Sequence, residues 1–298
     1  MGLKHLSTLA SDRPGNMIIA GADEGMLFFL TTQPLWVSGA IVVGSTTVLA
    51  MLGLFVVRRC VAPERLSEHN EVAGFNFATV GVLYAVLLAF AIVVVWEKFS
   101  AAETTVAEEA GAAESIFRLS HGIQDPGGAD LRQALSEYLA VTVAIDWPAM
   151  ERGTIGTGTR PARQALDAVY AAFLKTAAAQ RIEAPLMSEV MRQLDAIAQG
   201  RRARLIASEG TVPGVIWFLL FGGALLTIGF TFFFGMRSLP AQALMTGLLS
   251  ILIFSELLAI VAIDRPFSGI VKLGPHALAN VLELHKAPAG PGGSSERH

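Results

Sequence analysis

Residues 72–119 decide the fold, and they read VAGFNFATVGVLYAVLLAFAIVVVWEKFSAAETTVAEEAGAAESIFRL. The stretch is apolar up to Trp96. Beyond Glu97, apolar residues recur every three or four positions with glutamates between them. That spacing is typical of an amphipathic helix, and no proline interrupts it. We therefore expect one continuous helix of roughly 48 residues, about 70 Å long. Such a helix crosses a membrane and continues well beyond it.

Besides residues 72–96, three other segments of the chain are uncharged, at residues 25–57, 210–236 and 238–255. Each approaches or exceeds the ~20 apolar residues that cross about 30 Å of hydrocarbon. The composition agrees, because only 16% of the residues are charged, against about 25% in soluble proteins. We expect an all-α polytopic membrane protein with an extramembrane helical bundle between spans two and three. The four predicted spans lie at about residues 35–57, 74–96, 213–236 and 241–263.

Charge and composition exclude several classes of function. The net charge of −3 is unlike that of a strongly basic nucleic-acid-binding protein. The single cysteine, Cys60, forms no intramolecular disulfide, and the six histidines are too dispersed to complete a zinc site with it. No phosphate-binding glycine-rich motif is present. We expect no enzymatic activity, no cofactor, no metal site and no nucleic-acid partner.

Four crossings place the N-terminus, the central segment and the C-terminus on one side of the membrane, called side A here. The two short loops then lie on the opposite side, side B. The basic residues of side A favour the cytoplasmic face of a bacterial inner membrane, although Arg58, Arg59 and Arg65 on side B argue the other way. The sequence predicts five parts of the chain. They are an N-terminal extension (1–34), a transmembrane hairpin (35–97), an extramembrane helical bundle (98–212), a second hairpin (213–264) and a C-terminal tail (265–298), disordered after about residue 287.

Three amphipathic helices follow the long helix within the central segment. Their apolar residues share one face over residues 131–145, 166–177 and 187–197. The sequence Asp-Pro-Gly-Gly at 125–128 is a strong turn signal that ends the long helix. The last of the three helices leads through an arginine-rich stretch into span three.

Several short motifs occur together and in order along the chain. They are His69-Asn70 with Gly74, the run Gly81–Leu88, Trp96-Glu97, Tyr138 with Asp146-Trp147-Pro148, Arg202 and Arg204, Pro213 with Trp217, and Asp264–Gly269. In this combination the chain resembles the bestrophin-like family of bacterial membrane proteins, from about Gly39 to Ala279. The extended N-terminus and Glu256 depart from the pattern of the family.

The resemblance implies four spans with a large loop between spans two and three. True bestrophins share that layout and form anion channels whose pore is lined by the second span. The chain is therefore expected to be an oligomeric ion channel, passing anions, with membrane lipids and copies of itself as partners. Because a shared fold does not establish function, the alternative of a non-conducting scaffold or sensor, whose outer helices bind a partner, stays open.

Five polar residues inside or beside the spans are candidates for lining the pore. Asn70, Asn76, Thr79 and Tyr84 supply the polar atoms of span two, and Glu256 is a carboxylate within span four. A charged group in hydrocarbon is costly, so it is either functional or paired. In the structural alternative, Glu256 is protonated or bonded to Asn76 or a threonine, and span two packs closely against its neighbours.

Charged residues near the side-A ends of the spans are candidates for a pore mouth or vestibule. They are Glu97, Arg201, Arg202, Arg204, Asp264 and Arg265. Grouped together, the three arginines would attract anions. In the alternative interpretation they bind lipid phosphates or pair with Glu97, Glu103 or Glu209.

Two further groups have a structural interpretation. The sequence Asp264-Arg265-Pro266-Phe267 is interpreted as a structural corner that packs against Trp96 and Glu97, and in the channel hypothesis it helps to shape the mouth of the pore. Tyr138, Trp147 and Pro148 are interpreted as core residues of the outer bundle.

Overall fold

The computed structural model describes residues 35–61, 70–156, 158–210, 212–236 and 238–286, and every regular element within these ranges is helical. The all-α prediction is therefore confirmed. The predicted N-terminal extension and the residues after 286 lie outside the described residues. The elements are α2 (Leu35–Cys60), α4 (Asn70–Ser120), α5 (Gly127–Val141), the π-helical segment η1 (Thr142–Asp146), α6 (Trp147–Glu151), α7 (Arg160–Ala179), α8 (Ala184–Ala207), α9 (Gly214–Phe232), α10 (Leu239–Ile263) and α11 (His276–Lys286).

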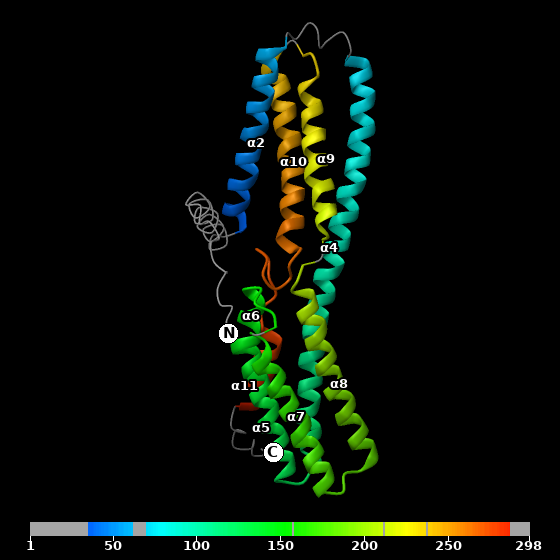
Figure 1. The fold of residues 1–298 in the computed structure, drawn as a ribbon, viewed down its shortest axis with the longest axis vertical. Coiled ribbons are helices and arrows are strands. Elements are labelled where there is room, and N and C mark those ends of the chain that lie inside the picture. The colour runs from blue at the N-terminus through cyan, green and yellow to red at the C-terminus, as the bar shows by residue number, and fades with distance from the viewer. Residues whose placement is uncertain (1–34, 62–69, 157, 211, 237, 287–298) are drawn as a thin grey trace, which may run out of the picture.

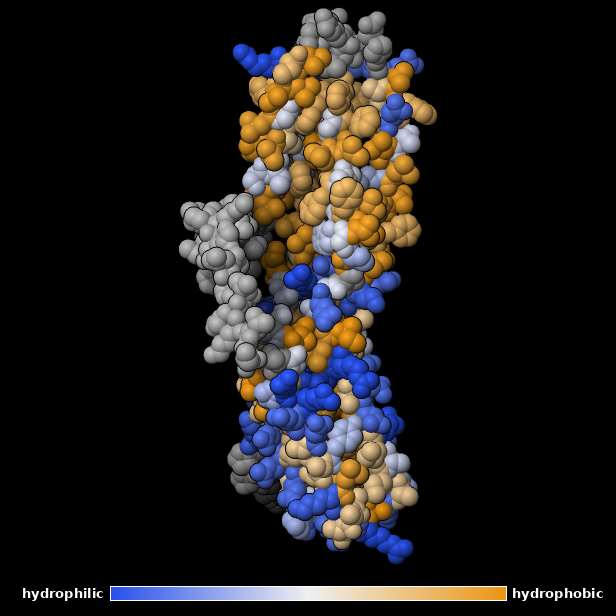
Figure 2. All heavy atoms as spheres, in the orientation of Figure 1, coloured by the Kyte–Doolittle hydropathy of each residue, from blue (hydrophilic) through white to orange (hydrophobic). Residues whose placement is uncertain are grey.

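Four of these helices are long and apolar enough to cross a membrane: α2, α4, α9 and α10. They stand side by side in one half of the molecule (Figure 1), and the surface of that half is largely apolar (Figure 2). Helix α2 packs mainly on α10, whereas α4 packs on both α9 and α10. The four-span prediction is confirmed, and the chain is a multi-pass membrane protein.

Helix α4 continues without interruption from the membrane layer into the extramembrane bundle (Figure 1). It contains 51 residues, which corresponds to about 76 Å. Its buried side chains follow one line, through Tyr84, Leu88 and Val95 in the membrane half and Val106 and Phe117 in the bundle half. The three- and four-residue spacing predicted from the sequence is therefore the spacing of the packed face.

The bundle packs around the second half of α4. Helix α8 runs along α4, α5 runs along α7, and α11 contacts both α4 and α5. Its core includes Leu131, Tyr138, Val169, Phe173 and Leu194, which are completely buried. The predicted bundle helices are present, and Tyr138 and Trp147 belong to the core as expected.

Helix α11 corrects the sequence interpretation, which treated all residues after 264 as a tail. Leu278, Val281 and Leu282 are buried against the bundle. Their spacing of three and four residues is the signal that could have identified this helix.

Candidate functional site

The face of α4 that points away from its packed line is exposed along most of the helix. We define this free face by six exposed residues, namely Thr79, Val86, Phe90, Glu97, Thr104 and Glu108. Spacings of four and seven residues keep them on one side of the helix. From first to last they extend over about 44 Å. The line is apolar in its membrane part, apart from Thr79, and acidic beyond it.

Asn76 and Thr79 both lie exposed on α4. The hydroxyl of Thr79 donates to the carbonyl of Phe75 at 3.1 Å, one turn earlier. Its donor is therefore satisfied within the helix, while the oxygen remains able to accept a hydrogen bond from water. Both residues remain candidates for lining a path along α4.

Asn70 and Tyr84 instead connect helices within the subunit. The side chain of Asn70 donates to the carbonyl of Gly235 at 3.2 Å and accepts from its amide at 2.9 Å. The buried hydroxyl of Tyr84 donates to the carbonyl of Leu220 at 3.0 Å. Its ring lies so close to Gly223 that a Cβ there would come within 2.4 Å of it. Within the subunit, Asn70 and Tyr84 therefore form contacts between helices.

Glu256 is half-buried on α10, a helix that packs on α4. The structural alternative offered a hydrogen bond from Glu256 to Asn76 or to a threonine; within the described ranges the carboxylate makes no such bond and no other hydrogen bond. The position of Glu256 next to α4 keeps it a candidate for a group that responds to ions or protons.

Arg204 lies inside the bundle rather than at a vestibule. Its side chain is fully buried, and its Nε and Nη2 donate to the two carboxylate oxygens of Glu109 at 3.0 and 3.2 Å. The guanidinium also lies over the Trp147 ring, 5.1 Å from the centroid. The alternative interpretation paired the arginines with lipid phosphates or with Glu97, Glu103 or Glu209; for Arg204 that pairing was wrong, because its partner is Glu109.

Arg201 forms a second buried pair beside the first. Its Nε donates to Asp146 Oδ2 at 3.2 Å and its Nη2 donates to the carbonyl of Thr159 at 2.7 Å. Asp146 also lies 3.6 Å from Nη2 of Arg204, which joins the two pairs. Arg202, between them in sequence, is exposed. The cluster of three arginines predicted to attract anions is therefore divided, with one cation on the surface.

A tyrosine completes this cluster. The Tyr138 hydroxyl donates to Glu109 Oε1 at 2.6 Å. We name the five side chains the buried ion-pair network; they are Glu109, Tyr138, Asp146, Arg201 and Arg204. Two carboxylates face two guanidiniums, so the network is neutral overall. It ties α4, α5 and η1 to α8, which leads directly toward α9.

Burial and the neighbouring charges together set the pKa values in the network. Desolvation raises the pKa of the Tyr138 phenol, and the neighbouring Glu109 raises it further, so Tyr138 stays a hydrogen-bond donor. Burial also raises the pKa of Asp146, against the opposing effect of Arg201 and Arg204. For Arg204, burial lowers the pKa but Glu109 raises it, and the net shift is upward. Arg204 therefore stays charged.

The corner after α10 packs on the bundle. Asp264 is buried and accepts a hydrogen bond from the Val212 amide at 2.9 Å, while Arg265 is exposed. The Phe267 ring meets Trp147 edge-on, with centroids 5.5 Å apart. The corner was expected to pack against Trp96 and Glu97, yet both of these are exposed. The aromatic partner of this corner is Trp147, from the outer bundle.

Comparison with known proteins places the chain in a family. The sequence profile of the bestrophin-like domain matches residues 44–278. The chain belongs to the bestrophin-like family. The expected family resemblance is thus confirmed over most of this bestrophin-like chain, and no curated protein sequence matches it significantly.

Solved structures of bacterial bestrophin homologues share this fold. One variant of the homologue from Klebsiella pneumoniae superposes with a TM-score of 0.67 at 14% identity, covering 82% of this chain and 98% of that one. The homologue solved by zinc phasing gives a TM-score of 0.63 at 14% identity, covering 80% and 95%. At this identity the likeness establishes the fold and leaves the activity to be argued from the residues.

Within the described ranges, no group of three or more histidine, cysteine, aspartate or glutamate side chains is arranged to hold a metal ion. The candidate site of this bestrophin-like chain is the exposed free face of α4, and the buried ion-pair network fixes α4 against α8 in the bundle.

Proposed function

We propose that this chain is the subunit of a homo-oligomeric ion channel in which the free face of α4 lines the ion path. The observation that supports this most is the continuity of that face. A single unbroken helix offers Thr79 within the membrane and Glu97, Thr104 and Glu108 beyond it, all on one side.

The opposite face of α4 is fully used inside the subunit. Tyr84, Leu88 and Val95 pack against α9 and α10, and Val106 and Phe117 pack in the bundle. The free face is therefore available to line a path. One helix cannot enclose a path, so several copies must surround a common axis.

The charges on α4 favour cations over the anions implied by the family resemblance. Glu97 and Glu108 are exposed on the free face, and rings of carboxylates select cations whereas rings of arginine or lysine select anions. Of the three arginines expected to attract anions, Arg201 and Arg204 are neutralised by Asp146 and Glu109, and Arg202 alone is exposed. We therefore place cation conduction ahead of anion conduction.

Flux measurements on purified full-length protein in liposomes test this proposal. We expect a sodium or potassium gradient to dissipate faster than in protein-free vesicles, and a chloride gradient to dissipate more slowly than the cation gradient. The double variant Glu97→Gln/Glu108→Gln should lower the preference for cations. The matched control is Glu103→Gln, which removes an exposed carboxylate of α4 that lies off the free face.

Two results would contradict the proposal. Absence of any ion flux over a range of pH and calcium concentration favours the non-conducting scaffold or sensor. A chloride preference that the double variant leaves unchanged refutes the assignment of selectivity to the free face.

We also place the bundle on the cytoplasmic side of the bacterial inner membrane. The native Cys60 at the side-B end of α2 is exposed, so an impermeant maleimide should label it in intact spheroplasts. The exposed Arg152, after α6, offers the opposite site: Arg152→Cys in a Cys60→Ser background should react only after lysis. The reverse pattern would invert the orientation.

A further inference from the structure

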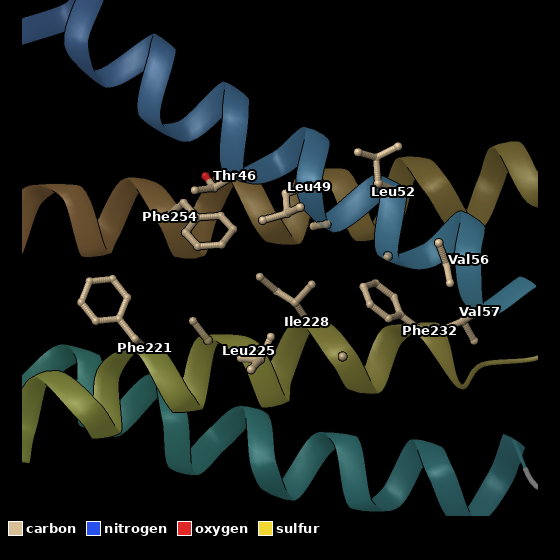
Figure 3. A pocket seen from close by; sticks show the side chains of 14 residues that line it. Thr46, Leu49, Leu52, Val56, Val57, Phe221, Leu225, Ile228, Phe232 and Phe254 are labelled. Carbon is tan, nitrogen blue, oxygen red and sulfur yellow. The ribbon is translucent and has the colours of Figure 1, made fainter. Parts of the chain in front are cut away.

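A groove lies between α2 and α9 in the membrane layer, with α10 behind it (Figure 3). Its volume is about 700 Å³. Leu49 and Val56 border it from α2, Leu225 and Phe232 from α9, and Phe254 from α10. The lining is almost entirely apolar.

Among the described residues that line the groove, only Thr46 has a polar side chain. Its hydroxyl donates to the carbonyl of Val42 at 2.8 Å within its own helix. The groove therefore presents no polar group that requires a polar ligand. An aqueous solute would gain no hydrogen bonds there to replace those it makes in water.

The length of the groove along α2 matches one leaflet of a bilayer. Along α2 it extends from Thr46 to Val57, which is about 17 Å of helix. The hydrocarbon of a whole bilayer is about 30 Å thick, so one leaflet contributes about 15 Å. Val57 directly precedes Arg58 and Arg59, at the side-B end of the helix. The groove therefore extends from the side-B interface to about the membrane centre.

The two arginines that follow Val57 at the end of α2 differ in their bonding. Arg58 is held within the subunit, where its Nε donates to Gln242 Oε1 at 2.9 Å and its Nη2 donates to the carbonyl of Met236. Arg59 is exposed. It follows Val56 by three residues and Leu52 by seven, so it lies on the side of α2 that borders the groove.

We propose that this groove binds one acyl chain of an anionic phospholipid of the side-B leaflet, with the lipid phosphate at Arg59. An empty groove in hydrocarbon loses dispersion contacts on both walls, and an acyl chain restores them. A guanidinium matches a phosphate in charge and hydrogen-bonding geometry. The site is independent of conduction, so its test requires no current.

A glycine on the groove wall offers a clean perturbation. Gly229 lines the groove, and a Cβ added to it meets no atom within 4 Å. Gly229→Leu therefore places bulk in the groove without a clash at Cβ. Gly222 lies two turns away on the same helix, is equally free of neighbours and does not line the groove. Gly222→Leu is the matched control.

Native mass spectrometry of the purified full-length protein measures the binding. The protein is titrated with phosphatidylglycerol and with phosphatidylcholine of the same acyl chains. We expect retained phosphatidylglycerol on the unaltered protein and on Gly222→Leu, and an affinity about tenfold lower on Gly229→Leu. Arg59→Gln should bind both lipids equally, because it removes the headgroup contact but leaves the groove open.

Three outcomes would overturn the proposal. Equal lipid affinity of Gly229→Leu and Gly222→Leu means that no chain occupies the groove. Equal affinity of the unaltered protein for the two lipids removes the role of Arg59. A smaller oligomer for Gly229→Leu without any loss of lipid shows that a second copy of the chain fills the groove. Thermal unfolding of each variant checks that the fold is retained.

Discussion

Removal of Arg204 should destabilise the extramembrane bundle far more than removal of its exposed neighbour Arg202. In Arg204→Met, Glu109 keeps only the hydrogen bond from Tyr138, and Asp146 keeps only its pair with Arg201. Both carboxylates remain fully buried. The buried ion-pair network then carries one uncompensated negative charge.

The expected cost follows from that charge. Breaking a buried ion pair by removing one partner costs about 3–5 kcal/mol. Each kcal/mol lowers the melting temperature of a domain of 150–250 residues by about 2–4 °C, so Arg204→Met should lower it by about 6–20 °C. Arg202→Met should change the free energy of unfolding by no more than about 0.5 kcal/mol, as is usual for a surface residue.

The double variant Glu109→Leu/Arg204→Met separates charge from packing. It removes both members of the pair and leaves mainly the buried Tyr138 hydroxyl without its acceptor, at a cost of about 1–3 kcal/mol. It should therefore unfold at a higher temperature than Arg204→Met alone.

Tryptophan fluorescence during heating in mild detergent measures these transitions, and Trp147 lies beside the guanidinium. The reasoning is refuted if Arg204→Met melts within about 2 °C of the unaltered protein, which is less than 1 kcal/mol, or if the double variant is the less stable of the two.

Two further predictions concern packing and pH. Gly223→Ala should destabilise the membrane layer by about 1–3 kcal/mol, because its Cβ would lie 2.4 Å from the Tyr84 ring. Gly222→Ala, whose Cβ would have no neighbour within 4 Å, should be neutral. Unfolding in detergent compares the two variants, and equal stability would contradict the packing of Tyr84 on Gly223. His285 stacks on Phe117 with centroids 4.0 Å apart, and burial lowers its pKa. The folded state favours the neutral imidazole of His285. The contribution of His285 to the free energy of unfolding is therefore complete above about pH 6.5, and it is lost as the pH falls toward the folded-state pKa. Amide hydrogen exchange in α11 should accelerate over that range in the unaltered protein and not in His285→Phe.

The sequence predicts the fold well because the relevant patterns are local. The long helix α4 follows from the absence of proline and from apolar residues three or four apart between Phe99 and Phe117, and both signals act within a few turns. The spans follow from hydrocarbon thickness in the same way. Helix α11 carries a similar but shorter signal.

The partners within the candidate site could not be predicted in the same way. Arg204 pairs with Glu109, 95 positions away, although other glutamates on α4 are similar in sequence. The choice depends on how α8 lies along α4, which is a property of the packed bundle. Tyr84 likewise could not be placed, because a tyrosine in an apolar helix suits both a pore wall and a helix contact. The position of Tyr84 is set by its hydrogen bond to the carbonyl of Leu220 and by the space that Gly223 leaves for its ring.

Thiol accessibility on α4 during flux tests the central claim most directly. In a Cys60→Ser background, Thr79→Cys places a thiol on the free face, nine residues after α4 begins at Asn70. Leu248→Cys places one on an exposed side of α10, nine residues after that helix begins at Leu239. A charged, water-soluble thiol reagent should reduce ion flux through Thr79→Cys in liposomes and leave flux through Leu248→Cys unchanged. Unchanged flux through Thr79→Cys, or equal inhibition of both variants, would contradict a path lined by α4.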